Sequence, residues 1–129
     1  MSEPSTTPTP VALLVAHDDT CRIYSTYLSQ VGFDLLVANS AAAAFQAAID
    51  HRPDLIITDV RLPGWAHGIR LLVKLRLDMR TTTIPIIVVT DQAIRTEEGR
   101  TLAAGCDLYL TTPCKPDVLA HHARTLVAA

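Results

Sequence analysis

The segment LIITDVRLPG, residues 55–64, decides the fold class of this chain. It opens with four residues that are apolar or β-branched, and Asp59 follows them directly. A short unbroken apolar run of this kind is typical of a strand that is buried on both faces of a parallel sheet. We therefore predict a central strand over 55–58 with a carboxylate at its carboxyl end.

Four more apolar runs surround this one, and segments with helical spacing separate them. The expected strands are 11–16, 33–38, 55–58, 84–90 and 108–111, and the expected helices are 20–31, 41–49, 69–77, 92–104 and 116–127. Strands and helices that alternate five times predict an α/β fold, a parallel sheet with helices on both faces. We expect one domain over 11–129 and, because residues 1–10 are rich in Pro, Ser and Thr, a disordered tail before it.

The composition limits the classes of function. A chain of 129 residues with a formal charge of −2 suits a single globular domain and gives no basic surface for direct binding of nucleic acid. No apolar run reaches the ~18 residues of a membrane span, and the N-terminus does not resemble a secretory signal. The three cysteines are odd in number and lack CxxC spacing, which favours the cytoplasm over a disulfide-rich setting.

Carboxylates follow several of the predicted strands. Asp18 and Asp19 come after the first strand and Asp59 after the third, while Thr90 ends the fourth. The carboxyl ends of parallel strands share one edge of the sheet, where ligands bind in open α/β folds. Carboxylates gathered there repel one another, and a hard cation such as Mg²⁺ relieves that repulsion. The alternative for the acidic pair, that one aspartate simply caps the next helix, stays open.

The loop after the first strand carries neither GxGxxG nor GxxxxGK[ST], and its acidic residues would repel nucleotide phosphates. A nucleotide-binding enzyme is therefore not expected.

Four motifs together resemble the receiver domain of two-component response regulators: VAHDD, LIITDVRLPG, IIVVTD and GCDLYLTTP. The resemblance covers about residues 11–127. It implies a flavodoxin-like, doubly wound sheet of five parallel strands in the order 2-1-3-4-5. It also implies a Mg²⁺ cofactor and the following roles: Asp59 as phosphoacceptor, Asp18, Asp19 and the backbone carbonyl of Arg61 as further metal ligands, Thr90 as switch hydroxyl and Tyr109 as switch aromatic.

The sequence departs from the family pattern in two places. The family keeps a lysine directly before the proline of the turn after the fifth strand, and this chain has Thr112 there. Lys115 lies three residues further on, and we expect it to point to solvent from the start of the last helix. The segment PGWAHG is one residue longer than usual, so we expect Trp65 in a loop near the acidic residues.

The resemblance implies a non-enzymatic, cytoplasmic, bacterial signalling domain. A histidine kinase or phosphotransfer protein would donate the phosphoryl group, and a downstream protein would bind the face formed by the fourth helix, fifth strand and fifth helix, around 92–127. A homodimer stays open. The alternative is a degenerate receiver that binds partners without phosphorylation, for which Thr112 is the supporting feature. A haloacid-dehalogenase-type hydrolase ranks far behind because no DxD is present.

Overall fold

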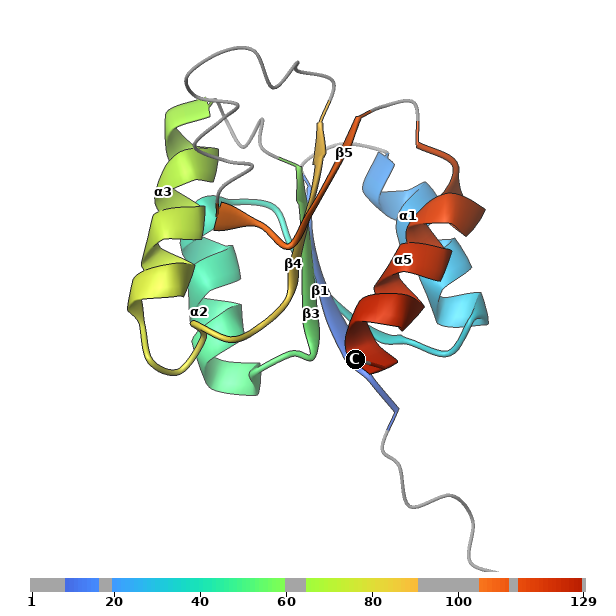
Figure 1. Cartoon of the computed structure of the whole chain (residues 1–129), viewed down its shortest axis with the longest axis horizontal. Helices are drawn as coiled ribbons and strands as arrows, with labels where there is room; N and C mark the ends of the chain where they lie inside the picture. The colour runs from blue at the N-terminus through green and yellow to red at the C-terminus, as the bar shows by residue number, and fades with distance from the viewer. Residues whose placement is uncertain (1–8, 17–19, 60–64, 91–104, 112–113, 129) are drawn as a thin grey trace, which may run out of the picture.

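A five-stranded parallel sheet forms the centre of the molecule (Figure 1). The computed structural model describes residues 9–16, 20–59, 65–90, 105–111 and 114–128. The strands pair in the order β2-β1-β3-β4-β5, which confirms the predicted doubly wound sheet. Their bounds are β1 Val11–Val15, β2 Asp34–Ala38, β3 Leu55–Asp59, β4 Ile86–Thr90 and β5 Leu108–Thr111.

The described helices cover both faces of this sheet. One face carries α2 and α3 and the other carries α1 and α5, as Figure 1 shows. The helix predicted over 92–104 lies outside the described residues. The bounds are α1 Thr20–Gln30, α2 Ala41–His51, α3 Trp65–Leu77 and α5 Pro116–Ala128.

Side chains of the central strands alternate between two apolar cores. Ile56 of β3 is fully buried in the core under α2 and α3, and its neighbour Ile57 is 1% exposed in the core under α1 and α5. The same alternation occurs at Leu13 and Leu14 of β1. Each such side chain contributes about 1.5–3 kcal/mol when it is buried. Because these strands are buried on both faces, an apolar residue is favoured at every position, which explains the unbroken apolar runs.

The ends of α2 follow local rules that the sequence shows only in part. Ser40 is the N-cap, and its Oγ accepts a hydrogen bond from the Ala43 backbone N–H at 3.1 Å. At the other end Arg52 adopts a left-handed conformation with φ of 46°, and its N–H donates to the Ala48 carbonyl. Glycine is the usual residue at such a position, so Arg52 carries backbone strain.

Several sequence-based boundaries were wrong, and two of the differences have a clear physical reason. Trp65 is the first residue of α3 and not part of a loop, so Gly68 lies inside the helix that it was expected to precede. A glycine inside a helix costs about 1 kcal/mol, and the packing of α3 on the sheet outweighs this cost. β4 starts at Ile86 and not at 84, because Pro85 has no N–H to give to the ladder, although its carbonyl accepts from Ile56 N at 2.9 Å.

The guanidinium of Arg76 joins the end of α3 to the start of β5. Its Nε donates to the Gly105 carbonyl at 3.0 Å, and its Nη1 donates to the carbonyls of Thr82 at 2.9 Å and Ile84 at 2.8 Å. Its Nη2 forms an ion pair with Asp107 Oδ2 at 2.8 Å. One side chain therefore holds three backbone segments together.

The chain enters β5 under two further constraints. Asp107 Oδ2 also accepts from the Ile86 backbone N–H at 2.8 Å, which fixes β5 against β4. Gly105 sits so close to α3 that an added Cβ would lie 2.9 Å from Leu72 Cδ2. Glycine at this position therefore permits the close approach of the two segments.

Candidate functional site

The strand register brings the predicted site residues to one edge of the sheet. Val15, the last residue of β1, pairs with Thr58, so Asp59 lies one position beyond the end of β1. Asp59 in turn pairs with Val89, and Thr90 ends β4 one residue later. The ends of three neighbouring strands therefore coincide, and the backbone of Asp59 lies on the middle one.

The acidic pair belongs to the connection between β1 and α1. Asp18 and Asp19 themselves lie outside the described residues. The residues that flank them are described: Ala16 donates its backbone N–H to the Ala38 carbonyl at 3.0 Å, and Thr20 begins α1. The pair thus belongs to a connection only a few residues long, anchored at the edge that carries Asp59.

The donor chemistry of these residues suits Mg²⁺. The candidate ligands Asp18, Asp19, Asp59 and the Arg61 carbonyl supply only oxygen, the donor that hard cations prefer. Arg61 also lies outside the described residues. Within the described part of the chain, no group of three His, Cys, Asp or Glu residues could hold a metal ion.

Tyr109 lies on β5 opposite Val88 of β4 and packs against the core under α2 and α3. Its side chain is half-buried. Burial raises the pKa of the Tyr109 phenol, and the nearby Cys106 raises this pKa further. The phenol therefore stays neutral at physiological pH and keeps a proton to donate.

The turn between β5 and α5 is described on both sides of Thr112, which itself lies outside the described residues. On one side, Thr111 pairs with Thr90 across the β4–β5 ladder. On the other, Lys115 is exposed, as predicted, and its carbonyl accepts from the Leu119 N–H at 3.0 Å. Lys115 therefore lies directly before α5.

Sequence reasoning missed the role of Tyr24. This α1 side chain is only 7% exposed, and its O–H donates to the Cys114 carbonyl at 2.9 Å. The bond ties α1 to the end of the turn that contains Thr112. The partner of the Tyr24 hydroxyl lies 90 residues away, and nothing in the sequence indicates this contact.

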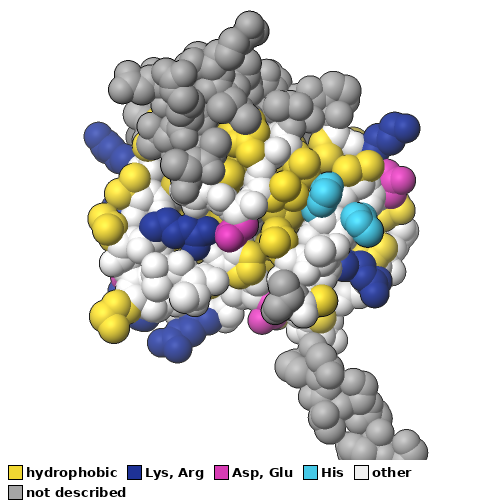
Figure 2. All heavy atoms as spheres, in the orientation of Figure 1, with side chains coloured by type: hydrophobic (Ala, Val, Ile, Leu, Met, Phe, Trp, Pro, Cys, Tyr) yellow, Lys and Arg dark blue, Asp and Glu magenta, His cyan; other side chains and the backbone are white. Residues whose placement is uncertain are grey.

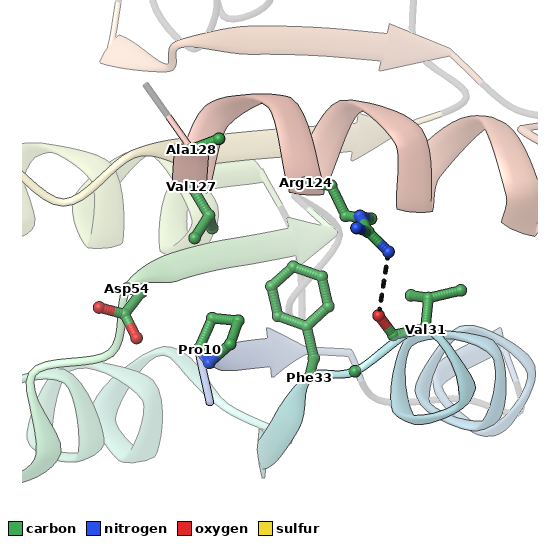
Figure 3. A pocket seen from close by; sticks show the side chains of 8 residues that line it. Pro10, Val31, Phe33, Asp54, Arg124, Val127 and Ala128 are labelled. Carbon is green, nitrogen blue, oxygen red and sulfur yellow. Dashed lines mark hydrogen bonds between the residues drawn. The ribbon is translucent and has the colours of Figure 1, made fainter. Parts of the chain in front are cut away.

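A cavity of about 510 Å³ lies at the opposite, amino-terminal end of the sheet (Figure 3). The ring of Phe33 lies between Arg124 and Pro10 in this cavity. Arg124 Nη1 donates to the Val31 carbonyl at 3.4 Å, and Asp54 Oδ2 accepts from the Val11 N–H at 2.8 Å. Both charged side chains are therefore engaged in hydrogen bonds to backbone groups. The cavity lies at the end of the sheet opposite the edge that carries Asp59.

No helix in the described part of the chain is both long and apolar enough to cross a membrane.

Comparisons with known proteins agree with the geometry. The family model of the response regulator receiver domain matches residues 12–124. The phosphate regulon transcriptional regulatory protein PhoB of Pseudomonas aeruginosa is 36% identical over 89 residues, which make up 69% of this chain but 38% of that protein. The polar-differentiation response regulator DivK of Brucella anthropi is 27% identical over 106 residues, 81% of this chain and 85% of that protein.

Solved structures show the same fold. A putative response regulator from Chloroflexus aurantiacus superimposes with a TM-score of 0.84 at 29% identity, covering 95% of this chain and 100% of that chain. The chemotaxis response regulator CheY4 of Vibrio cholerae has a TM-score of 0.80 at 23% identity, covering 92% and 99% of the two chains.

Proposed function

The chain belongs to the response regulator receiver-domain family, the phosphoacceptor signalling domains of two-component systems, and from that premise we propose that Asp59 is its phosphoacceptor. The position of Asp59 carries the proposal. It ends the central strand β3 at the edge where β1 and β4 also end. The donor would be a histidine kinase or a phosphotransfer protein, and the domain would act in the cytoplasm.

The proposed transfer is a displacement at phosphorus. A carboxylate oxygen of Asp59 forms a bond to the phosphorus atom while the phosphorus–nitrogen bond of the donor's phosphohistidine breaks, and the donor imidazole leaves. Asp18, Asp19, Asp59 and the Arg61 carbonyl would hold Mg²⁺, which supplies positive charge that offsets the charge of the phosphoryl group. The remaining contribution of the protein is to position these groups.

The proposed response to phosphorylation runs from Thr90 to Tyr109. The Thr90 hydroxyl would bond a phosphoryl oxygen, and Tyr109 on the paired strand β5 would change its rotamer. The strand register supports this order, because Tyr109 pairs with Val88, two residues before Thr90. β5 and α5, together with residues 92–104, would then present an altered surface to a downstream protein.

Thr112 weakens this coupling in our proposal. The neutral hydroxyl would replace the family's lysine, and its hydrogen bond to an anionic phosphoryl oxygen lacks the positive charge that strengthens the bond from a lysine. Lys115 directly precedes α5 and is exposed, so we do not assign it the missing role. Asp59 would therefore accept phosphate while the shift at Tyr109 stays partial.

Intact-mass measurement tests the acceptor. The wild type, incubated with Mg²⁺ and acetyl phosphate, should gain one phosphoryl group, and Asp59→Asn should gain none. Asp34→Asn is the matched control, because it removes an exposed carboxylate at the amino end of β2. Labelling of the Asp59→Asn variant at the wild-type level would refute the assignment, and failure of the wild type to react would favour the phosphorylation-independent alternative.

Chemical shifts test the coupling. With a beryllofluoride mimic bound, Thr112→Lys should show a larger shift change at Tyr109 than the wild type. A full change in the wild type that Lys115→Ala abolishes would show that Lys115 performs the lysine's role.

A further inference from the structure

The outward side of α3 carries apolar and basic side chains where a surface helix ordinarily carries polar ones. Val73 and Leu77 are 45% and 79% exposed, and Met79, just past the helix, is 91% exposed. Arg70 and Lys74 are exposed on the same helix. We call these five residues the α3 outer surface. Figure 2 shows hydrophobic and basic side chains together along the left border of the molecule, over α3.

The helical positions place these side chains in two adjacent rows. At 3.6 residues per turn, the four helical members fall within an arc of roughly 100°. Arg70 and Lys74 form one row and Val73 and Leu77 the other, each with a spacing of four residues. The opposite side of α3 holds the buried Leu75 of the core. α3 therefore has an inner apolar side for the sheet and an outer side that is half apolar and half basic.

The basic row is open to a partner. Within the described residues, neither Arg70 nor Lys74 has a carboxylate within salt-bridge distance, and the Lys74 Nζ lies 5.4 Å from the centre of the Phe45 ring. Two other cations of this region are already neutralised: Arg76 by Asp107 at 2.8 Å, and Arg80 by Asp78 at 2.7 Å. Among the described residues of α3, the unpaired positive charge is thus confined to one row.

We propose that the α3 outer surface binds an acidic amphipathic helix of a partner protein. The apolar side of that helix would cover Val73, Leu77 and Met79, and carboxylates along its flank would pair with Arg70 and Lys74. An anionic membrane suits the surface less well, because the two cations of the basic row raise affinity for such a membrane only about thirtyfold. None of the five residues of the α3 outer surface belongs to the proposed phosphorylation site.

Two synthetic peptides test the charge and apolar rows. Each is a helix of about four turns with leucines along one side, flanked by glutamates in one peptide and by lysines in the other. The glutamate peptide should bind the wild type with amide shift changes confined to α3 and residue 79. Arg70→Glu with Lys74→Glu should weaken that binding about tenfold or more and should bind the lysine peptide instead. Leu77→Ser should weaken both complexes.

Each other outcome overturns the proposal. The glutamate peptide could fail to bind the wild type, bind with shift changes on α5, or bind the wild type and the charge-reversed variant equally. Binding to phosphatidylglycerol vesicles without binding to the glutamate peptide would assign the surface to a membrane. Self-association that Leu77→Ser abolishes would assign it to a second copy of the chain. The swap of peptide preference also shows that the variant is folded.

Discussion

Replacing Arg76 with alanine should destabilise the domain by about 3 kcal/mol. The guanidinium makes two part-buried bonds to carbonyls, at Gly105 and Ile84, and each contributes about 1 kcal/mol net. The exposed bond to Thr82 and the partly exposed ion pair with Asp107 contribute about 0.5 kcal/mol each, since water competes for both. Against a typical total of about 5–15 kcal/mol, this loss is large.

Urea unfolding followed by far-UV circular dichroism measures the loss, with an unchanged slope and a lower midpoint. Arg80→Ala is the matched control. It removes the same side chain and an ion pair of 2.7 Å, but its partner Asp78 lies only two residues away in the chain. Its midpoint should shift far less. Equal shifts of the urea midpoint in the two variants would show that the hydrogen bonds from Arg76 to distant backbone segments do not contribute the expected stability.

Three further results are expected. Arg52→Gly should raise stability by about 0.5–1 kcal/mol, because glycine tolerates the φ of 46° while keeping the N–H bond, and a midpoint no higher than that of Arg52→Ala would contradict this. The hydrogen bond from the Arg80 side chain lowers the pKa of Asp78 to about 2. This hydrogen bond therefore stabilises the fold fully above the unfolded pKa of Asp78 near 3.8, and the stabilisation is lost as the pH falls through 2. A ¹³C titration should find that pKa higher in Arg80→Ala but still below its usual value, because the backbone N–H of residue 80 continues to donate to Asp78 Oδ1. Mg²⁺ at a hundredfold excess over its Kd should stabilise the wild type by about 2.7 kcal/mol in thermal melts, and Asp19→Asn should reduce that gain and raise the melting temperature without Mg²⁺; identical Mg²⁺ responses would count against the metal site.

The sheet could be predicted because its signal is local. Each of the strands β1, β3 and β4 is an apolar run, and such a run alone is enough to predict a strand that is buried on two faces. The strand order came from the family resemblance, since periodicity does not say which strands are neighbours. Ser40 was predictable for the same local reason, as a cap lies next to its helix.

The missed features depend on contacts between distant segments. Trp65 was placed in a loop because the segment PGWAHG is one residue longer than the family pattern, whereas the structure starts α3 at Trp65 and includes Gly68 in the helix. Arg76 looked like any basic residue near a helix end, and its partners lie up to 31 residues away. The candidate site also combines features that local sequence predicts with features that depend on distant contacts. Strand ends locate Asp59 and Thr90 by backbone register, but the sequence does not show that Tyr24 braces the neighbouring turn.

The hydrogen bond between Tyr24 and residue 114 also affects which substitutions the chain can accept during evolution. Its acceptor is a main-chain carbonyl, so the bond survives any side chain at position 114 that leaves the packing intact. The donor, in contrast, is one hydroxyl at position 24, and phenylalanine there would keep the ring while losing the bond. Among close relatives we therefore expect tyrosine to persist at position 24 while position 114 varies, with no covariation between the two columns. A contact that matters structurally would then be invisible to methods that infer contacts from paired substitutions.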